Sequence, residues 1–545
     1  MWGRDFIDGI RWIWIQLRGL RRGFFINCGI GFLRVLISLG FVWVSKHIVD
    51  IATHKSDGDM LCWVIVMVAV IMLQLLIQLV MSRYRERNRL DVSNKLRQRF
   101  FRLVMNSRWN GKDSLHTGDT VNRLEEDIRT VCATINENIP QLLVMVFQLL
   151  CASVFLFTMQ KNLLWVLLII MPIALVVSRI YYKTLRDLNG KIRAKDSEIQ
   201  SHLQENLLKR VLILSMIKLD DCVEALSRMQ AELRDISVKK VRCSTRGRFF
   251  VSLGFMTGYC VTFCWGAFGI LSGSVTYGMM TAFLQLVSQV QNPIVNMSRQ
   301  LPQLVQTLTS IDRLKELFNL PQEDNEAQYF MQGKIGVRVE NLTFVYPGNQ
   351  NPTIQNMSYD FRPGVSTAIM GETGAGKSTL MKVLLNILQH QEGRVVLYND
   401  HEELEMNPAL RCNFMYVPQG NSLISGTVRD NLRLGKADAT DSEMVESLEI
   451  ACADFVMRRP EGLDTKCSEQ GSGLSEGQAQ RIAIARALLQ PGKVMLMDEA
   501  CSALDDETER RVLQNLSAHC EDRTIIWITH HVAVREWLNG VLDVS

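Results

Sequence analysis

The chain has 545 residues, a formal net charge of +4 and a mean hydropathy of +0.06. The length exceeds that of one typical domain, the hydropathy fits neither a soluble protein nor a chain embedded in a membrane throughout, and the charge is too small to indicate a partner. The thirteen cysteines form no Cys-x-x-Cys framework, which argues against a cysteine metal site and a disulfide-based fold. We therefore expect two parts, an apolar part of about 300 residues followed by an α/β domain.

Residues 1–23 predict a helix that lies along the membrane surface. Apolar residues recur there at helical spacing, beside Arg and Trp, at Trp2, Phe6, Ile10, Ile13 and Leu17. The alternative is a cleaved signal, but the stretch lacks a clean apolar core and a small-residue cleavage site.

Residues 24–320 contain six segments that are long and apolar enough to cross a membrane. They lie at about 24–46, 60–82, 138–160, 162–182, 249–271 and 276–297. The connections 83–137 and 183–248 are long, charged and helical in periodicity, whereas the others are short. Because basic residues beside spans mark the cytoplasmic side, we expect both long connections and both termini in the cytoplasm, with the helices extending into it.

Two features inside the spans are candidates for a site. Arg34 lies within the first span, where a charge is costly, so we consider contact with a substrate; snorkelling or ion pairing near a helix end is the alternative. Cys260 and Cys264 stand one helical turn apart in an apolar run. We interpret them as small packing residues rather than as a pair of metal ligands.

Residues 321–335 are typical of a linker, and residues 336–545 have the pattern of an α/β domain. A predicted strand leads into Gly371–Ser378, which fits G-x-x-x-x-G-K-[ST], and a predicted helix follows. Glycines let backbone N–H groups surround phosphates, Lys377 can reach the β- and γ-phosphates, and the Ser378 hydroxyl can bind Mg²⁺. This context predicts an ATP site.

Two further strands supply chemistry to that site. "VMLMDEA" predicts a buried strand with Asp498 and Glu499 at its carboxyl end, where open α/β sheets bind ligands. Asp498 is the expected Mg²⁺ ligand, and Glu499 is placed to act as general base toward water. "TIIWITHH" predicts another strand, after which His530 could contact the γ-phosphate; His531 lies one residue further and is less favoured.

The stretch "GLSEGQAQR" places Ser475, Gly477 and Gln478 at the start of a predicted helix. Ser and Gly at that position often only cap a helix. The exposed N–H groups of a helix N-terminus also attract anions, so these residues are candidates for phosphate binding.

Together these motifs resemble the ABC transporter family, specifically its exporters with a fused membrane and nucleotide-binding domain. "GETGAGKST" is similar to the Walker A loop, "VMLMDEA" to the Walker B strand, "LSEGQ" to the signature, "CSALD" to the D-loop and "HTGDTVNRLEEDI" to the exporter membrane domain. The resemblance implies a Q-loop glutamine at Gln419, a switch histidine at His530 and a ring at Tyr346 that stacks on adenine. The implied fold is an all-α domain of six transmembrane helices followed by an α/β P-loop domain.

The resemblance also implies the mechanism, which is ATP-driven export by a dimer in which the signature of one copy closes over the ATP held by the other. The implied cofactors are ATP and Mg²⁺. The implied partners are a second copy of the chain (or a related chain in a heterodimer) and membrane lipids, with no nucleic acid, and the implied location is a bacterial inner membrane. Short helices near residues 110–117 and 205–212 are expected to contact the nucleotide-binding domain.

The expected site residues fall into three groups. Glu499, His530 and Gln419 are expected to be catalytic, and Ser378, Gln419 and Asp498 to hold the metal. The expected nucleotide-binding residues are Tyr346, Gly371, Glu372, Thr373, Gly374, Ala375, Gly376, Lys377, Ser378, Thr379, Ser475, Gly477 and Gln478.

The sequence departs from the family pattern at several points. Glu476 stands at the middle glycine of the signature, Ser468 at a glycine just before it and Cys501 at a usual Thr. Fifteen residues follow His530, where the family usually continues through a strand pair and a helix. The resemblance therefore does not define how the C-terminal segment packs in the expected domain.

The main alternative from another class is an ATP-gated regulator or channel with little hydrolysis. Such a protein would be expected to lack the Walker B glutamate or the switch histidine, and Glu499 and His530 are both present. The spans argue against a soluble ATPase, and the fused parts argue against an importer. The expected substrate is a lipid, a lipid-linked molecule or a hydrophobic small molecule. A peptide is the alternative, which we expect less because only about 23 residues precede the first span and leave no N-terminal protease domain.

Overall fold

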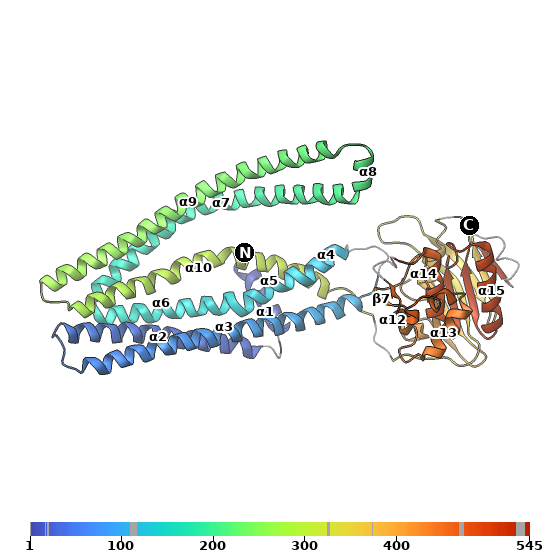
Figure 1. Cartoon of the computed structure of the whole chain (residues 1–545), viewed down its shortest axis with the longest axis horizontal. Helices are drawn as coiled ribbons and strands as arrows, with labels where there is room; N and C mark the ends of the chain where they lie inside the picture. Colours follow the sequence, from blue (N-terminus) through green and yellow to red (C-terminus); the bar gives the residue numbers. More distant parts are fainter. Residues whose placement is uncertain are drawn as a thin grey trace. The chain divides into compact units, whose positions relative to one another are not determined.

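The computed structural model describes residues 2–16, 18, 21–109, 117–323, 327–372, 374–467, 473–529 and 540–544. The chain divides into two compact units. One unit consists of Met1–Arg99 and Asn122–Lys315, and the other of Phe100–Val121 and Glu316–Ser545. The first unit is helical, and the second contains the strands (Figure 1).

Long helices make up the first unit. They are α1 (Trp2–Gln16), α2 (Arg21–Ala52), α3 (Met60–Met105), α6 (Ile139–Met159), α7 (Lys161–Leu208), α9 (Leu219–Leu271) and α10 (Tyr277–Phe318). Short elements lead into α6, namely α4 (Thr117–Asn122), η1 (Arg123–Asp127), α5 (Ile128–Ala133) and η2 (Thr134–Asn138). Helices α7 and α9 lie side by side, and α8 (Arg210–Ser215) joins them at one end (Figure 1).

Each of the six expected spans falls within one of these long helices. Helices α2, α3 and α9, and the continuous stretch from Gly118 to Met159, are long and apolar enough to cross a membrane. The segment 162–182 belongs to α7, where most of the side chains lie outside the described part. Helix α10 does not reach the same apolarity over its described residues. Its Phe283 and Leu286 are fully buried, so α10 meets protein on that face and can carry polar residues without exposing them to lipid.

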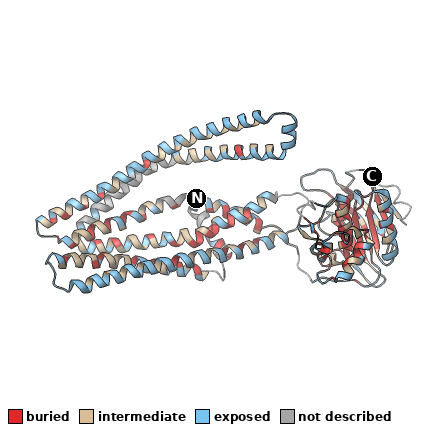
Figure 2. Ribbon diagram, viewed as in Figure 1, coloured by how far each residue is buried: buried red, intermediate tan, exposed pale blue. Residues whose placement is uncertain are grey.

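Helix α3 shows how the helical unit meets its surroundings. Its apolar stretch has no buried residues, and side chains such as Leu61, Ile65 and Met72 are exposed. Figure 2 shows most of this helix in the colours of exposed and intermediate residues. Burying apolar surface is worth about 25 cal/mol per Å², so such a surface is unfavourable in water. A bilayer covers it, which agrees with the expected second span at 60–82.

The N-terminal helix is tied to α2 by an aromatic and cationic cluster. The Arg21 guanidinium donates to the Trp14 carbonyl at 2.7 Å, and the Trp14 ring contacts the Phe24 ring with centroids 5.1 Å apart. The side chains of Trp2, Phe6 and Ile10, and the whole of Leu17, lie outside the described residues. The location of this helix at the membrane surface stays a prediction.

Two π-helical turns precede α6, and the sequence analysis did not anticipate them. At the first, the Asp127 carboxylate accepts a hydrogen bond from Ser310 Oγ at 2.8 Å and lies 3.4 Å from the Arg313 guanidinium. At the second, the Thr134 and Thr307 hydroxyls are 2.6 Å apart. The extra residue of a π turn is therefore used here to bring buried polar groups against α10.

The second unit contains an antiparallel sheet and a parallel sheet. The antiparallel sheet has the order β2-β1-β4-β5, with β1 (Gly336–Phe344), β2 (Ile354–Phe361), β4 (Glu392–Tyr398) and β5 (Glu403–Glu405). The parallel sheet has the order β11-β3-β10-β9-β6, with β3 (Ser366–Met370), β6 (Phe414–Val417), β9 (Val494–Asp498), β10 (Thr524–Ile528) and β11 (Gly540–Asp543). The main helices are α11 (Lys377–Leu384), α12 (Val428–Arg433), α13 (Asp441–Ile450), α14 (Glu476–Leu488) and α15 (Asp506–His519).

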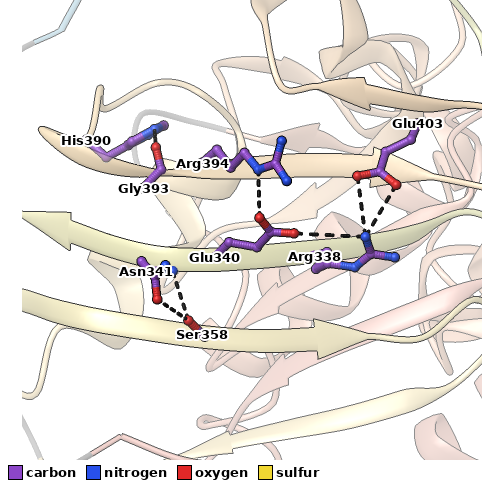
Figure 3. A network of polar contacts seen from close by, with 8 residues as sticks. All are labelled: Arg338, Glu340, Asn341, Ser358, His390, Gly393, Arg394 and Glu403. Atoms are coloured by element: carbon purple, nitrogen blue, oxygen red, sulfur yellow. Dashed lines mark hydrogen bonds and ion pairs between the residues drawn. The ribbon is translucent and has the colours of Figure 1, made fainter.

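The register of the antiparallel sheet is supported by charged pairs across its strands (Figure 3). Arg394 of β4 donates to Glu340 of β1 at 2.6 Å, and Arg338 of β1 donates to Glu403 of β5 at 3.3 Å. The Arg394–Glu340 pair joins neighbouring strands, and the Arg338–Glu403 pair reaches across β4, so a one-residue slip of the register would separate both. Because these pairs are exposed, we expect each to contribute little to stability.

The parallel sheet is the centre of the unit. All five residues of β9 and of β10 are buried, as in strands covered on both faces. At the C-terminus, β11 pairs in parallel with β3, and the Val544 N–H donates to the Met370 carbonyl at 2.8 Å. Within "VLDVS", Val541–Asp543 thus belong to a strand of the sheet.

Two segments that are adjacent in sequence to the helical unit, within 100–121 and from residue 316 onward, belong to the second unit and are bonded within it. The Arg411 guanidinium makes two 3.0 Å hydrogen bonds to the Glu323 carboxylate, and Glu323 N–H donates to the Asn106 carbonyl at 2.9 Å. Beside them, the Lys382 ammonium lies 4.9 Å from the centre of the Trp109 ring. The expected contact helix near residues 110–117 lies outside the described residues except for Thr117, and the one near 205–212 corresponds to the end of α7 and the start of α8.

Candidate ATP site

The topology of the parallel sheet brings four segments to one edge. Strands β3, β6, β9 and β10 run in the same direction, so the loops after them meet at their carboxyl ends. These loops carry the Gly371–Gly376 segment, Gln419, Glu499 and Thr529 respectively. His530, which follows Thr529, lies outside the described residues, as does Thr373 in the first loop.

The loop after β3 has the backbone of a phosphate-binding loop. Gly371, Gly374 and Gly376 have φ values of 146°, 92° and 90°, which residues with a side chain rarely adopt. A Cβ on Gly376 would lie 2.8 Å from the Thr353 carbonyl oxygen, so the close approach also requires glycine. The Lys377 ammonium is buried and donates to the carbonyls of Gly371 and Glu372, both at 2.8 Å, which places it at the centre of the loop.

The residues expected to hold Mg²⁺ are adjacent. Ser378 Oγ donates to Asp498 Oδ1 at 2.9 Å, and Asp498 is only 2% exposed. Burial, and then the nearby Glu499 carboxylate, raise the pKa of Asp498, while the bond from Ser378 opposes them. Hydroxyl and carboxylate oxygens are the donors that Mg²⁺ prefers, and Mg²⁺ usually takes its other ligands from water and phosphates. This donor set fits Mg²⁺, and the described residues contain no cluster of three or more His, Cys, Asp or Glu side chains that would form a separate metal cage.

The expected base is held in an unusual backbone conformation. Glu499 has a φ of 47°, in the left-handed region, and its N–H donates to the Ile528 carbonyl of β10 at 3.1 Å. Its carboxylate accepts a hydrogen bond from Gln419 Nε2 at 2.6 Å. The glutamine is therefore placed beside the base, and in the described part of the chain no hydrogen bond joins it to Ser378 or Asp498.

Tyr346 lies beside the phosphate loop. Its hydroxyl is 3.0 Å from the Thr379 hydroxyl of α11, and its ring meets the Phe344 ring edge to face at 4.9 Å. The residue is only partly buried, so part of its surface is accessible. This arrangement agrees with the proposal that Tyr346 stacks on adenine.

Replacing Tyr346 with Ala is expected to weaken ATP binding without changing the chemical step. Stacking of a base on an aromatic ring is worth about 1–3 kcal/mol, so the Kd for ATP should rise about tenfold or more. Tyr346→Phe is the matched control, because it keeps the ring and removes only the bond to Thr379. Equilibrium binding of a fluorescent ATP analogue measures both variants, and an unchanged Kd in Tyr346→Ala would place the adenine elsewhere.

The signature residues form a capping box at the N-terminus of α14. Ser475 Oγ accepts from the Gln478 N–H at 3.2 Å, and Gln478 Oε1 accepts from the Ser475 N–H at 3.1 Å. Glu476 is exposed, so its carboxylate need not lie against phosphates. Gly477 is buried, and a Cβ there would lie 2.6 Å from the Ala503 carbonyl oxygen. The capping box thus accounts for Ser475 and Gln478. The N–H groups of the first turn of α14 point away from the helix, as at any helix N-terminus.

Helix α14 also positions two neighbouring loops, through residues that the sequence analysis missed. The Gln480 side chain donates to Ser502 Oγ and accepts from the Ala503 N–H, both at 3.1 Å, which holds the D-loop. The partly buried Arg486 guanidinium donates to the Ser422 carbonyl and hydroxyl at 2.9 and 2.7 Å, which holds the segment after Gln419. Polar residues on the buried face of a predicted helix were the available signal. Of the departures from the family pattern, Cys501 is buried, and Ser468 lies outside the described part.

Comparisons with known proteins agree with this geometry. The ABC transporter transmembrane region matches residues 24–294, and the ABC transporter ATP-binding family model matches residues 354–502. The leukotoxin translocation ATP-binding protein LktB of Mannheimia haemolytica is 29% identical over 454 residues, and the leukotoxin export ATP-binding protein LtxB of Aggregatibacter actinomycetemcomitans is 29% identical over 456 residues. Each alignment covers 82% of this chain but only 63% of the relative, so the chain spans less than two thirds of their length.

A solved structure is similar over nearly the whole chain. It is the structure of a bacterial Atm1-family ABC exporter with ATP bound, with a TM-score of 0.80 and 21% sequence identity. The similarity covers 97% of this chain and 94% of that one. It shows that the fold is that of an exporter whose helical membrane domain is followed by an α/β domain.

Proposed function

Because the chain belongs to the ABC transporter family, we propose that it is a membrane-spanning exporter that uses ATP hydrolysis to move a substrate across a bacterial inner membrane. The observation that carries this proposal is the meeting of Lys377, the Ser378–Asp498 pair and the Gln419–Glu499 pair at one edge of the parallel sheet. The same chain carries helices long and apolar enough to cross a bilayer. A regulator or channel with little hydrolysis stays the alternative.

Each residue group has a defined part in the reaction. The loop N–H groups and Lys377 bind the phosphates. To do so, the Lys377 ammonium replaces its hydrogen bonds to the Gly371 and Glu372 carbonyls with hydrogen bonds to phosphate oxygens. Ser378 and Asp498 would hold Mg²⁺, which supplies charge neutralisation at the phosphates. Glu499 accepts a proton from the attacking water, and Gln419 orients the carboxylate that does so.

The working unit that we propose is a dimer with two shared sites. Ser475 Oγ already accepts the Gln478 N–H, so its own hydrogen is free to be donated to a phosphate of the partner's ATP. The outward N–H groups at the start of α14 and its dipole favour the same anion. A homodimer requires only this chain, and a heterodimer with a related chain is the second possibility.

The direction across the membrane follows from the charges. Basic residues flank the spans within 83–137 and 183–248, so we place these connections, both termini and the ATP site in the cytoplasm. The substrate class is open between two proposals. The names of the relatives, leukotoxin translocation and export proteins, favour a polypeptide, whereas the apolar spans led us to expect a lipid or a hydrophobic small molecule.

The test is ATP hydrolysis by the full chain reconstituted in nanodiscs. We expect hydrolysis that requires Mg²⁺ and is lost in Lys377→Ala, and transport into sealed proteoliposomes only when ATP is added outside. A well-folded protein that binds ATP and hydrolyses none of it would overturn the exporter in favour of the regulator or channel.

A further inference from the structure

A polar cavity that is open to the outside, with Arg34, Gln141, Asn292 and Asn296 of its lining exposed in the single chain, lies among the helices of the membrane unit. Its volume is about 260 Å³, and α2, α6 and α10 line it. Hydrophobic residues such as Val35 and Met145 form only part of the wall. The polar part consists of Arg34, Ser38, Gln141, Gln148, Asn292 and Asn296.

The spacing of these residues puts them in stripes that face the cavity. Arg34 and Ser38 are four residues apart, and so are Asn292 and Asn296, which places each pair on one face of its helix. The polar stripe continues past the cavity, where Gln289 Nε2 donates to Ser38 Oγ at 2.9 Å. The Gln289 Oε1 atom is buried without a hydrogen-bond partner in the described part, so this wall has unused hydrogen-bonding capacity.

Arg34 is too deep for its side chain to reach the end of the helix. It lies 13 residues after Arg21, where α2 begins, and 18 residues before Ala52, where α2 ends. At 1.5 Å per residue these separations are about 20 and 27 Å. Snorkelling to a helix end therefore does not explain this charge, and an ionised group at such depth usually belongs to a substrate or ion pathway.

The cavity offers no counter-charge to this arginine. None of the residues that line it is acidic, and Arg34 has no ion pair or hydrogen bond within the described ranges. Glu137, one turn before Gln141 in the chain, is already engaged, since its carboxylate lies 3.5 Å from the Arg89 guanidinium.

We propose that Arg34 binds an anionic group, a carboxylate or a phosphate, of the exported molecule. The surrounding amides and hydroxyls then bind the polar body of that molecule. This makes the substrate a water-soluble polar molecule with at least one negative charge rather than an acyl chain, which would leave the amide groups without partners. The inference rests on the proposed export function, because it names the substrate class of the same machine.

The test uses two peptides that differ in one charge. They are acetylated and amidated pentapeptides, Ser-Gly-Glu-Gly-Ser and Ser-Gly-Gln-Gly-Ser, and their equilibrium binding to the full chain in nanodiscs of zwitterionic lipid is measured without nucleotide. We expect the wild type to bind the Glu peptide about tenfold more tightly, as a charge-assisted hydrogen bond allows. Arg34→Gln should abolish this preference, and Arg34→Lys should keep part of it. Arg34→Glu should reverse the charge preference and bind a third peptide, in which Lys replaces the central Glu, more tightly than the Glu peptide.

Arg228→Gln is the matched control, because it removes one positive charge from an exposed site on α9, where the Arg228 guanidinium lies 3.5 Å from Glu224. It should keep the wild-type preference. Equal binding of both peptides by the wild type, no binding of either, or a preference that survives in Arg34→Gln would overturn the proposal. So would an Arg34-dependent response only to anionic phosphatidylglycerol, since the ligand would then be a lipid.

ATP hydrolysis by the same wild-type sample distinguishes failure of this inference from failure of the proposed function. Hydrolysis without a peptide preference would contradict the anionic substrate alone, whereas the absence of hydrolysis would contradict the proposed export function itself.

Discussion

Glu499→Gln is expected to lower steady-state ATP hydrolysis at least about 100-fold, because a positioned general base typically contributes about 10²–10⁴-fold to rate. The amide has nearly the same shape as the carboxylate, and its oxygen can still accept the 2.6 Å hydrogen bond from Gln419. The left-handed backbone at Glu499, bonded to Ile528, does not depend on the side-chain charge. We therefore expect unchanged ATP affinity and a dimer that stays closed with ATP bound.

Two measurements make this result specific. Single-turnover hydrolysis in nanodiscs reports the chemical step, and ATP that stays bound to the full chain through size-exclusion chromatography reports the closed dimer. Glu507→Gln is the control, since Glu507 is exposed on α15 and lies close in sequence. Hydrolysis near the wild-type rate in Glu499→Gln would remove Glu499 from the role of base.

The family and the order of its two parts were predictable because several local motifs each require particular residue types. Gly371–Ser378 contains glycines at positive φ followed by a lysine and a hydroxyl, so the residues needed for phosphate binding lie within one short segment. The strand that leads to Asp498 was predictable for a similar reason, since four consecutive apolar residues, Val494–Met497, all of them buried, leave little choice of structure. The comparisons confirm the resulting assignment to the ABC transporter family and show a fold similar to that of a solved exporter.

What the sequence could not provide are contacts between segments far apart in the chain. The bond from Ser310 to Asp127 depends on how α10 lies against a π turn, and no local pattern marks that turn. The hold of Gln480 on the D-loop likewise depends on tertiary packing. Apolarity alone was also an incomplete criterion for a membrane span, because α10 packs against other helices and is less apolar than the other spans. This packing is evident only from the burial of residues such as Phe283 and Leu286 in the structure.

The second large effect concerns the shared site, and a mixed dimer tests it. Lys377→Ala removes the ammonium from the phosphate loop of its own chain. A charge in the signature is better introduced at Ser475 than at Gly477, because any Cβ at Gly477 would lie 2.6 Å from the Ala503 oxygen and distort the D-loop. Ser475 is exposed, and Asp is as good an N-cap as Ser. Ser475→Asp therefore keeps α14 intact while placing a carboxylate where a phosphate would bind, and Ser475→Asn is the uncharged control.

Each parent homodimer is expected to trap almost no nucleotide with vanadate and Mg-ATP, because both of its sites contain one defect. The mixed dimer contains one Lys377→Ala chain and one Ser475→Asp chain and is purified through two different affinity tags. If each site is shared between the chains, one site has both defects and the other site has none. We expect about one trapped nucleotide per mixed dimer, since the helix N-terminus of one copy then completes the phosphate loop of the other. Trapping, rather than transport, is the observable, because turnover can require two working sites. If each site lay within a single chain, both sites of the mixed dimer would stay defective, and the absence of trapping in a correctly assembled mixed dimer would rule out α14 as a ligand of the partner's ATP.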